Sequence, residues 1–215
     1  MSTSTLLMLI ALLRYPSQGN LLPPDGPQRQ SSKLFSFIGD ACGIDYEEPV
    51  FRLPAELRSL ILQVTVGCSW NACTFFEMYQ SKDFQVKQID AIVDELDQVV
   101  AAGGAPHMRD AFLVDGDAMT LPTGKLEAIL GTINERLPRV RRISSYCLPR
   151  NVRGKSAEAL SKQRSNGLPF VYVGCVSGDD VVLSAMEKGE TAETSLEALE
   201  KLKEAGMKRS IMILL

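Results

Sequence analysis

The sequence contains very little histidine or tryptophan, with one residue of each among 215. The only histidine, His107, lies in the Gly/Pro-containing segment GGAPHMRD. A histidine-rich metal site and any catalytic arrangement that needs two histidines are therefore excluded. His107 itself is expected to lie on the surface.

The chain also lacks a long basic block and a long apolar run. Its net charge is -3, and its densest basic group, Arg139, Arg141 and Arg142, brackets the start of a predicted strand, where solvated surface is expected. We therefore expect no nucleic-acid partner. The apolar run 6–13 is shorter than the roughly 20 residues that span a bilayer, and no basic region precedes it, so neither a membrane span nor a secretory signal is expected.

The first part of the chain differs in composition from the rest. Residues 16–33 are rich in Pro, Gly, Ser and Gln, and no acidic residue precedes Asp25. Such a segment buries too little apolar surface to offset its ordering entropy. We expect residues 1–44 to be a flexible tail or a targeting segment, for a plastid or mitochondrion, and residues 45–215 to be one domain.

The five cysteines are an odd number in a chain too long for a small disulfide scaffold. A reducing, cytoplasmic location is expected, with thiols that bind metal or lie in the core. Cys68 and Cys73 form a C-x4-C pair, which differs from the C-x2-C spacing of zinc knuckles. On spacing alone, these two residues are free thiols or a redox pair.

From residue 60 onward, apolar strands alternate with helices whose buried positions repeat every three or four residues. The predicted strands are 60–66, 111–114, 140–145, 170–174 and 208–215, and the predicted helices are 86–102, 123–137, 156–167, 179–189 and 191–205. This α/β alternation predicts parallel strands joined by right-handed crossovers. A partial (β/α) barrel and an open doubly wound sheet both fit, and in either fold the loops after the strands carry the chemistry.

The loop after the first strand carries the most specific motif, VGCSWNACTFFEMY. It resembles the cluster loop of a bacterial-type group of radical S-adenosylmethionine (radical SAM) proteins, G-C-S-x-N-x-C-T-F-C-x-M-Y. The matching residues are Gly67, Cys68, Ser69, Asn71, Cys73, Thr74, Phe75, Met78 and Tyr79. Later segments, among them VDGDAMTLPTGKLEAIL and GLPFVYVGCVSGDDVVL, also resemble the group, over residues 45 to 215.

The resemblance implies a (β/α)6 barrel, of which about five βα units are present before the chain stops in its fifth strand. It further implies a 4Fe–4S cluster held by three cysteine thiolates, with Cys68 and Cys73 as two of them. The cluster of such proteins binds S-adenosylmethionine (SAM) and cleaves it reductively to a 5′-deoxyadenosyl radical. An electron donor such as a flavodoxin or ferredoxin is then an expected partner.

Two residues depart from the family pattern at cofactor positions. Phe76 stands where the third cysteine is expected, and phenylalanine cannot bind iron. Val176 stands where the family motif G-x-E-S-G-D-D has a polar residue. The resemblance therefore predicts a radical SAM protein whose cluster binding is impaired.

Other positions match the cofactor site of the family. These expected cofactor-binding residues are Tyr79, Asp115, Gly116, Asp117, Ser144 and Ser177. Each has a simpler interpretation: an acidic turn for 115–117, a packing role for Tyr79, and backbone hydrogen bonding for Ser144, with Ser145 and Tyr146 beside it. Cys147 and Cys175 also end strands, where inert buried thiols are expected.

Three hypotheses therefore stand side by side. The first is a radical SAM enzyme, or a fragment of one, impaired at Phe76 and Val176. The second is a non-catalytic relative that keeps the barrel as a binding or scaffold protein. The third is a thiol redox or zinc protein that uses Cys68 and Cys73.

Overall fold

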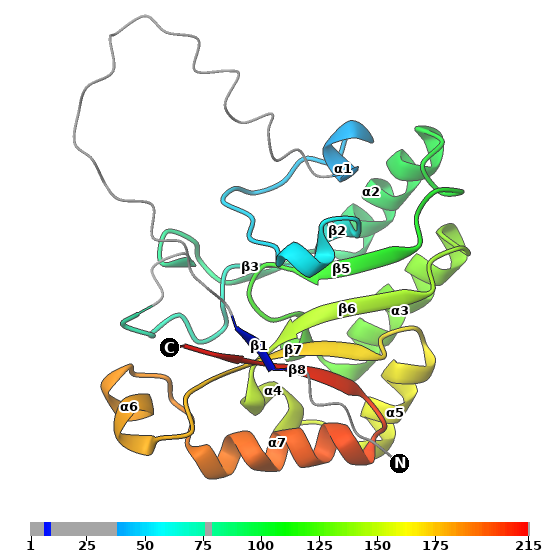
Figure 1. The fold of residues 1–215 in the computed structure, drawn as a ribbon. Coiled ribbons are helices and arrows are strands. Elements are labelled where there is room, and N and C mark those ends of the chain that lie inside the picture. Colours follow the sequence, from blue (N-terminus) through cyan, green and yellow to red (C-terminus); the bar gives the residue numbers. More distant parts are fainter. Residues whose placement is uncertain (1–6, 10–37, 76–78, 215) are drawn as a thin grey trace, which may run out of the picture.

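A computed structural model describes residues 7–9, 38–75 and 79–214 of the chain. Its main feature is a six-stranded sheet in the order β1-β8-β7-β6-β5-β2, in which every neighbouring pair is parallel (Figure 1). The strands are β1 (Leu7–Leu9), β2 (Leu60–Gln63), β5 (Asp110–Val114), β6 (Arg142–Cys147), β7 (Phe170–Val176) and β8 (Lys208–Ile213). A parallel sheet whose strands are joined by helices agrees with the predicted α/β architecture of a partial (β/α) barrel.

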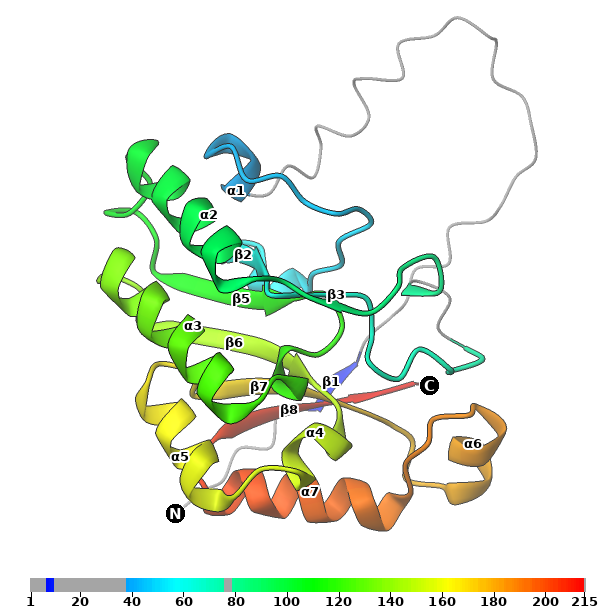
Figure 2. The same cartoon turned by 180° about the vertical axis from the view of Figure 1, so that it is seen from behind.

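Helices cover one face of the sheet, as Figure 2 shows from behind. They are α2 (Ile89–Ala101), α3 (Thr123–Arg136), α5 (Ala157–Ser165) and α7 (Ala192–Glu204), with the short α1 (Ile38–Ala41), α4 (Pro149–Arg153) and α6 (Asp180–Ala185) beside them. The predicted apolar stripe of α3 is buried: Leu126, Ile129, Leu130 and Ile133 are fully covered. Burial of such stripes against the β-branched strands is the main source of stability in this fold.

The predicted first strand, 60–66, differs from the observed one. It divides at Val64 into β2 and a second strand, β3 (Thr65–Val66), which pairs antiparallel with β4 (Gln85–Val86). The Thr65 hydroxyl donates to the backbone oxygen of Asp115 (2.7 Å), which keeps the start of β3 beside the end of β5. The predicted helix 86–102 consequently begins later, at Ile89.

Two short helices, α6 and α4, also differ from the prediction. The predicted helix 179–189 is shorter, because α6 ends at Ala185 and a turn with left-handed backbone follows. Helix α4 was not predicted; Pro149 at its first turn suits a helix start, since its missing N–H would have no partner there.

The segment before residue 45 contributes two elements within the described residues. Strand β1 lies along the outer edge of β8, and α1 lies near β2. The division into a tail (1–44) and a core domain (45–215) stays a prediction. Among the described residues, no helix is long and apolar enough to span a lipid bilayer.

A buried carboxylate closes the sheet face opposite the helices. Glu56, in the 3-10 turn η2 (Pro54–Glu56), is fully buried. It accepts hydrogen bonds from Arg142 (3.0 Å), Ser144 (2.9 Å) and Tyr172 (2.7 Å), and a further one from the Ser59 hydroxyl. Four donors compensate the desolvation of this charge and fix η2 against the early residues of the strands.

Candidate functional site

The candidate site is built from the loops that follow the carboxyl ends of the strands. Its main part is residues 67–84, here called the cysteine loop, which begins after β3 and returns through β4. The loop touches the turn after β5 by direct backbone contact. Gly116 has a φ of +90°, and a Cβ added there would lie 1.9 Å from the Gly67 carbonyl oxygen. Glycine is therefore required at 116 by close approach of two backbones.

The backbone conformation of Asn71 explains why asparagine suits this position of the motif. The residue adopts a left-handed φ of 44°, which asparagine tolerates better than most residues. Its side-chain amide donates to the backbone oxygen of Tyr79 (3.1 Å) inside the same loop. Asn71 thus shapes the cysteine loop and leaves the chemistry to its neighbours.

Asp115 is held in a buried ion pair at the base of the loop. Its Oδ2 accepts from Lys82 Nζ (2.8 Å) and from Gln63 Nε2 (2.8 Å), and both Asp115 and Lys82 are almost completely buried. Its second carboxylate oxygen, Oδ1, is buried and has no hydrogen-bond partner among the residues that the structure describes. An unsatisfied buried oxygen is costly unless a ligand or water donates to it.

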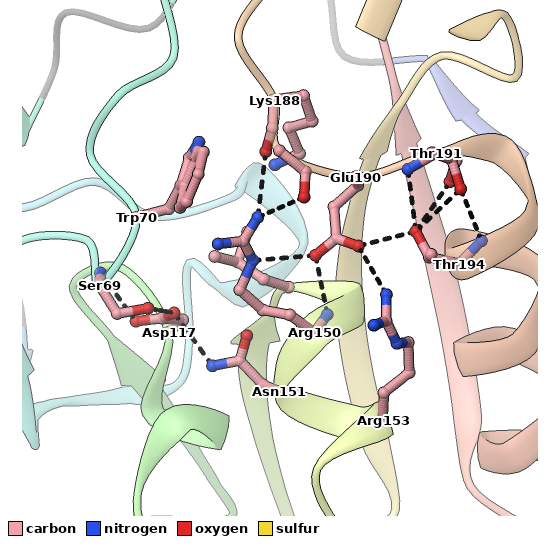
Figure 3. Close-up of polar contacts among 12 residues, drawn as sticks. Ser69, Trp70, Asp117, Arg150, Asn151, Arg153, Lys188, Glu190, Thr191 and Thr194 are labelled. Atoms are coloured by element: carbon pink, nitrogen blue, oxygen red, sulfur yellow. Dashed lines mark hydrogen bonds and ion pairs between the residues drawn. The ribbon is translucent and has the colours of Figure 1, made fainter. Parts of the chain in front are cut away.

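Asp117 connects the cysteine loop to α4. It accepts hydrogen bonds from the Ser69 hydroxyl, from the Ser69 backbone N–H (3.3 Å) and from Asn151 Nδ2 (3.0 Å), as Figure 3 shows. Burial raises the pKa of Asp117, and the hydrogen bonds from Ser69 and Asn151 oppose that rise. The predicted turn 115–117 is therefore at the site, with both carboxylates used to fix neighbouring segments.

The two loop cysteines are partly buried, and the pKa of both thiols is raised. Burial raises the pKa of Cys68, and Asp117 raises it further. Burial also raises the pKa of Cys73, against the opposing effect of Lys188 and Arg150. Thiols of this kind lack the lowered pKa of reactive redox cysteines.

The ligand set for a cluster is incomplete in the described part of the chain. That part holds no group of three or more His, Cys, Asp or Glu side chains that could bind a metal ion. The departure at Phe76 lies outside the described residues. Cys147 and Cys175 are buried at the ends of β6 and β7, and burial raises the pKa of Cys147 strongly and that of Cys175 to about 11.

Lys188 brings a buried cation to the site, and sequence reasoning missed it. The residue is 5% exposed, and its ammonium acts electrostatically on Cys68, Cys73 and Asp117. No ion pair or side-chain hydrogen bond involves this ammonium among residues 38–75 and 79–214. The turn that carries it is left-handed on both sides, at Glu187 (φ 50°) and Gly189 (φ 68°).

Trp70 and Arg150 link the cysteine loop to that turn. The Arg150 guanidinium lies 3.8 Å from the centroid of the Trp70 ring, and Trp70 Nε1 donates to the Glu187 backbone oxygen (2.8 Å). Glu190 accepts from Arg150 and Arg153 beside it (Figure 3). The sequence alone does not predict this contact, because an arginine 80 positions away in the chain leaves no local signal.

The end of β7 carries the second departure from the family pattern. Val176 has a φ of 70°, and the register between β7 and β8 shifts between Gly174 and Val176. A left-handed backbone is strained for a β-branched residue. Ser177 follows it, and its hydroxyl accepts from the Asp179 backbone N–H (3.1 Å) at the start of α6.

The remaining predicted residues are divided between the site and the core. Tyr79 is buried at the base of the cysteine loop, edge-on to Phe51 (5.6 Å between centroids), and burial raises its pKa. Ser144 is not brought to the loop: its hydroxyl donates to Glu56 in the early part of the sheet. The alternative of a structural hydrogen bond therefore describes Ser144, whose hydroxyl donates to the Glu56 carboxylate (2.9 Å) and to the backbone oxygen of Ala111 (3.5 Å).

Comparison with known proteins identifies the family. The sequence model described as "Radical SAM superfamily" matches residues 62–215. The chain belongs to the radical SAM superfamily. Among curated proteins, none matches this sequence.

Solved structures of radical SAM enzymes have the same fold. The cobalamin-dependent S-adenosylmethionine radical enzyme OxsB, with aqua-cobalamin and S-adenosylmethionine bound, superposes with a TM-score of 0.61 at 18% identity, over 74% of this chain and 24% of that one. Methylornithine synthase (PylB) gives 0.52 at 15% identity, over 71% and 43%. HydG, a maturase of the [FeFe]-hydrogenase, gives 0.52 at 14% identity, over 72% and 34%.

The chain thus spans between about a quarter and less than half of the length of these three structures. At this identity the likeness shows the fold alone. The family match confirms the predicted recognition, and the family's two cofactors are the expected 4Fe–4S cluster and SAM.

Proposed function

We propose that this radical SAM chain binds SAM at the carboxyl ends of its strands and that its own cluster binding and SAM cleavage are impaired. The supporting observation is the convergence of the cysteine loop, the 115–117 turn and Lys188 on one side of the sheet. Impairment rests on Phe76 and Val176, the two departures at cofactor positions.

Two features of the site suit the amino acid part of SAM. Asp115 Oδ1 is buried, no described residue donates to it, and it would accept a hydrogen bond from the SAM amino group. The Lys188 ammonium forms no ion pair with a described residue and would compensate the SAM carboxylate. Both groups fit a zwitterion better than an uncharged ligand.

The cofactor-binding residues that we propose are those that the family resemblance implies. The contacts on which the proposal rests differ from residue to residue. Asp115, Gly116 and Asp117 adjoin the cysteine loop, as do Tyr79 and the turn containing Ser177. Ser144 has the weakest support, because Glu56 already engages its hydroxyl.

The residues present do not fit a cluster held by three protein thiolates. Cys68 and Cys73 provide two thiols, and position 76 provides none. Soft thiolate donors are what iron–sulfur clusters require, so a loop with two of them is under-ligated. A reduced flavodoxin or ferredoxin would be a functional partner only for a form of the chain that assembles the cluster.

The test is anaerobic reconstitution with iron and sulfide of this chain and of the Phe76→Cys variant, side by side. We expect the variant to bind about four irons and to change its electron paramagnetic resonance signal when SAM is added, and the native chain to do neither. If both chains bind about four irons and respond to SAM, the impairment is wrong. If neither binds iron, the assignment of the loop as a cluster site is wrong.

SAM binding needs a separate measurement, because it does not depend on iron. Titration of the iron-free chain with SAM, with 5′-methylthioadenosine as the control that lacks the amino acid part, follows binding through Trp70 fluorescence. We expect SAM to bind more tightly, and Lys188→Met to remove at least part of that difference. Equal affinity of the two ligands would contradict the proposed recognition of the amino acid part.

The two other hypotheses predict different results. A non-catalytic binding or scaffold protein would bind SAM, or another ligand, in both the native chain and the Phe76→Cys variant without assembling iron. A thiol redox or zinc protein would bind zinc or form a Cys68–Cys73 disulfide. The raised pKa of both thiols disfavours the redox hypothesis, because their thiolate fraction is low near neutral pH.

A further inference from the structure

The cysteine loop contacts α4 through a stack of Trp70 on Arg150. We propose that Arg150 is a positioning residue that holds residues 70–74, and with them Cys73, against the 186–189 turn without any metal. The importance of that loop for cofactor binding rests on the proposed function, but the loop's attachment does not. The distance of 3.8 Å between guanidinium carbon and ring centroid is that of a close cation–π contact.

Arg150 is itself fixed in a single orientation by backbone and carboxylate acceptors. Its Nε donates to Glu190 Oε1 (2.9 Å), and its Nη2 donates to the backbone oxygens of Gly189 (2.7 Å) and Lys188 (3.4 Å). These bonds lie at the edge of the planar guanidinium and leave its face for the indole ring. Lysine at this position could not make the same set of contacts.

Glu190 anchors this arrangement to the rest of the fold. Its side chain is 1% exposed, and it accepts from Arg153 (3.4 Å) and from the Thr194 hydroxyl (2.8 Å) in the first turn of α7. A carboxylate beside a helix N-terminus is favoured by the helix dipole. Trp70 is therefore connected, through Arg150 and Glu190, to a long helix of the core.

The loop is attached on both sides of Cys73. On one side, Trp70 Nε1 donates to Glu187, and the ring packs so closely on Gly189 that a Cβ there would lie 2.3 Å from it. On the other side, the Thr74 backbone N–H donates to the Met186 oxygen (3.1 Å). These attachments use no sulfur ligand, so they suit a loop in which position 76 is not a thiol.

The experiment uses the full iron-free chain and compares Arg150→Gln with Arg153→Gln. Arg153 is the matched control, because it also bonds Glu190 but does not stack on Trp70. The first readout is hydrogen exchange of the Thr74 amide, and the second is acrylamide quenching of Trp70, the only tryptophan. Neither readout requires iron or SAM, so the proposal can fail while the proposed function stands, and the reverse.

We expect Arg150→Gln to accelerate exchange of the Thr74 amide on the order of tenfold and to increase the quenching of Trp70. Arg153→Gln should change the exchange rate of the Thr74 amide by less than about twofold, because the Arg153 side chain is partly exposed and its ion pair with Glu190 contributes little. Exchange in α3 should stay unchanged in both variants. The proposal is overturned if both variants give the same exchange at Thr74, or if α3 accelerates equally in Arg150→Gln.

A second variant keeps the test informative if Arg150→Gln does not fold. Trp70→Leu removes the ring and leaves the Arg150–Glu190 pair in place. It should give the same acceleration at Thr74 as the loss of Arg150. If the Thr74 amide of Trp70→Leu exchanges at the wild-type rate, the stack does not hold the loop.

Discussion

The Cα of Gly116 faces the carbonyl oxygen of Gly67, and the two backbones approach so closely that no side chain fits between them. We predict that Gly116→Ala destabilises the chain by about 3 kcal/mol, because it adds a clash to a left-handed φ. Urea unfolding measures this loss. Gly131→Ala, in the open middle of α3, is the control and should be neutral or stabilising. Equal effects at the two glycines would contradict the importance of the Gly67 contact.

The Lys82–Asp115 pair leads to a second prediction. Lys82→Met leaves a fully buried carboxylate without its cation, which costs about 3–5 kcal/mol of unfolding free energy. The control is Lys162→Met, which removes the exposed pair with Glu127 and should cost less than about 1 kcal/mol. Chemical denaturation of both variants decides the matter; a small loss for Lys82→Met would show that Asp115 is protonated or solvated in the folded chain.

The raised pKa of Asp117 predicts a dependence of stability on pH. The folded chain binds this proton more tightly than the unfolded chain, whose carboxyl keeps a value near 3.8. Stability from this group is therefore highest below that value and is lost as the pH rises through the raised pKa. Relative to Asp117→Asn, the native chain should become less stable from about pH 4 upward.

Urea unfolding at a series of pH values tests this prediction. The exposed Asp83→Asn serves as the control for general effects of removing a carboxylate. A constant free-energy difference between the native chain and Asp117→Asn would show that burial does not shift Asp117.

Gly189 gives a fourth prediction. Alanine there would place a Cβ 2.3 Å from the Trp70 ring and 2.5 Å from Arg150 Nη2, at a φ of +68°. Gly189→Ala should therefore displace the indole and increase its quenching by acrylamide, at a cost of about 1–3 kcal/mol. Gly178→Ala, with nothing within 4 Å, is the control. Unchanged quenching in Gly189→Ala would show that the ring can relax without leaving Arg150.

The sequence predicts the alternating strands and helices well, because the local spacing of apolar residues indicates which face of a helix or strand is buried. The stripe Leu126, Ile129, Leu130 and Ile133 was predicted and is buried. The break of the first strand at Val64 was not, because it accompanies the antiparallel pairing of Thr65 and Val66 with β4, about 20 residues further along the chain.

The same physical reason separates the predicted from the missed site residues. The cysteine loop and the 115–117 turn are visible as motifs, whereas Lys188 and Arg150 become site residues only through left-handed turns and long-range contacts. Ser144 is the opposite case: its position in a strand suggests the cofactor, whereas its hydroxyl donates to Glu56 from an upstream turn.

The short antiparallel pair of β3 and β4 has a consequence for how this protein can change over time. Val66 and Gln85 lie opposite each other, so the two ends of the cysteine loop are joined at its base whatever sequence lies between them. Gly67, Ser69 and Lys82 contact the 115–117 turn, so a substitution at any of these three positions also disturbs the end of β5. Variation that leaves the core intact is therefore expected at loop positions that make no contact outside the loop.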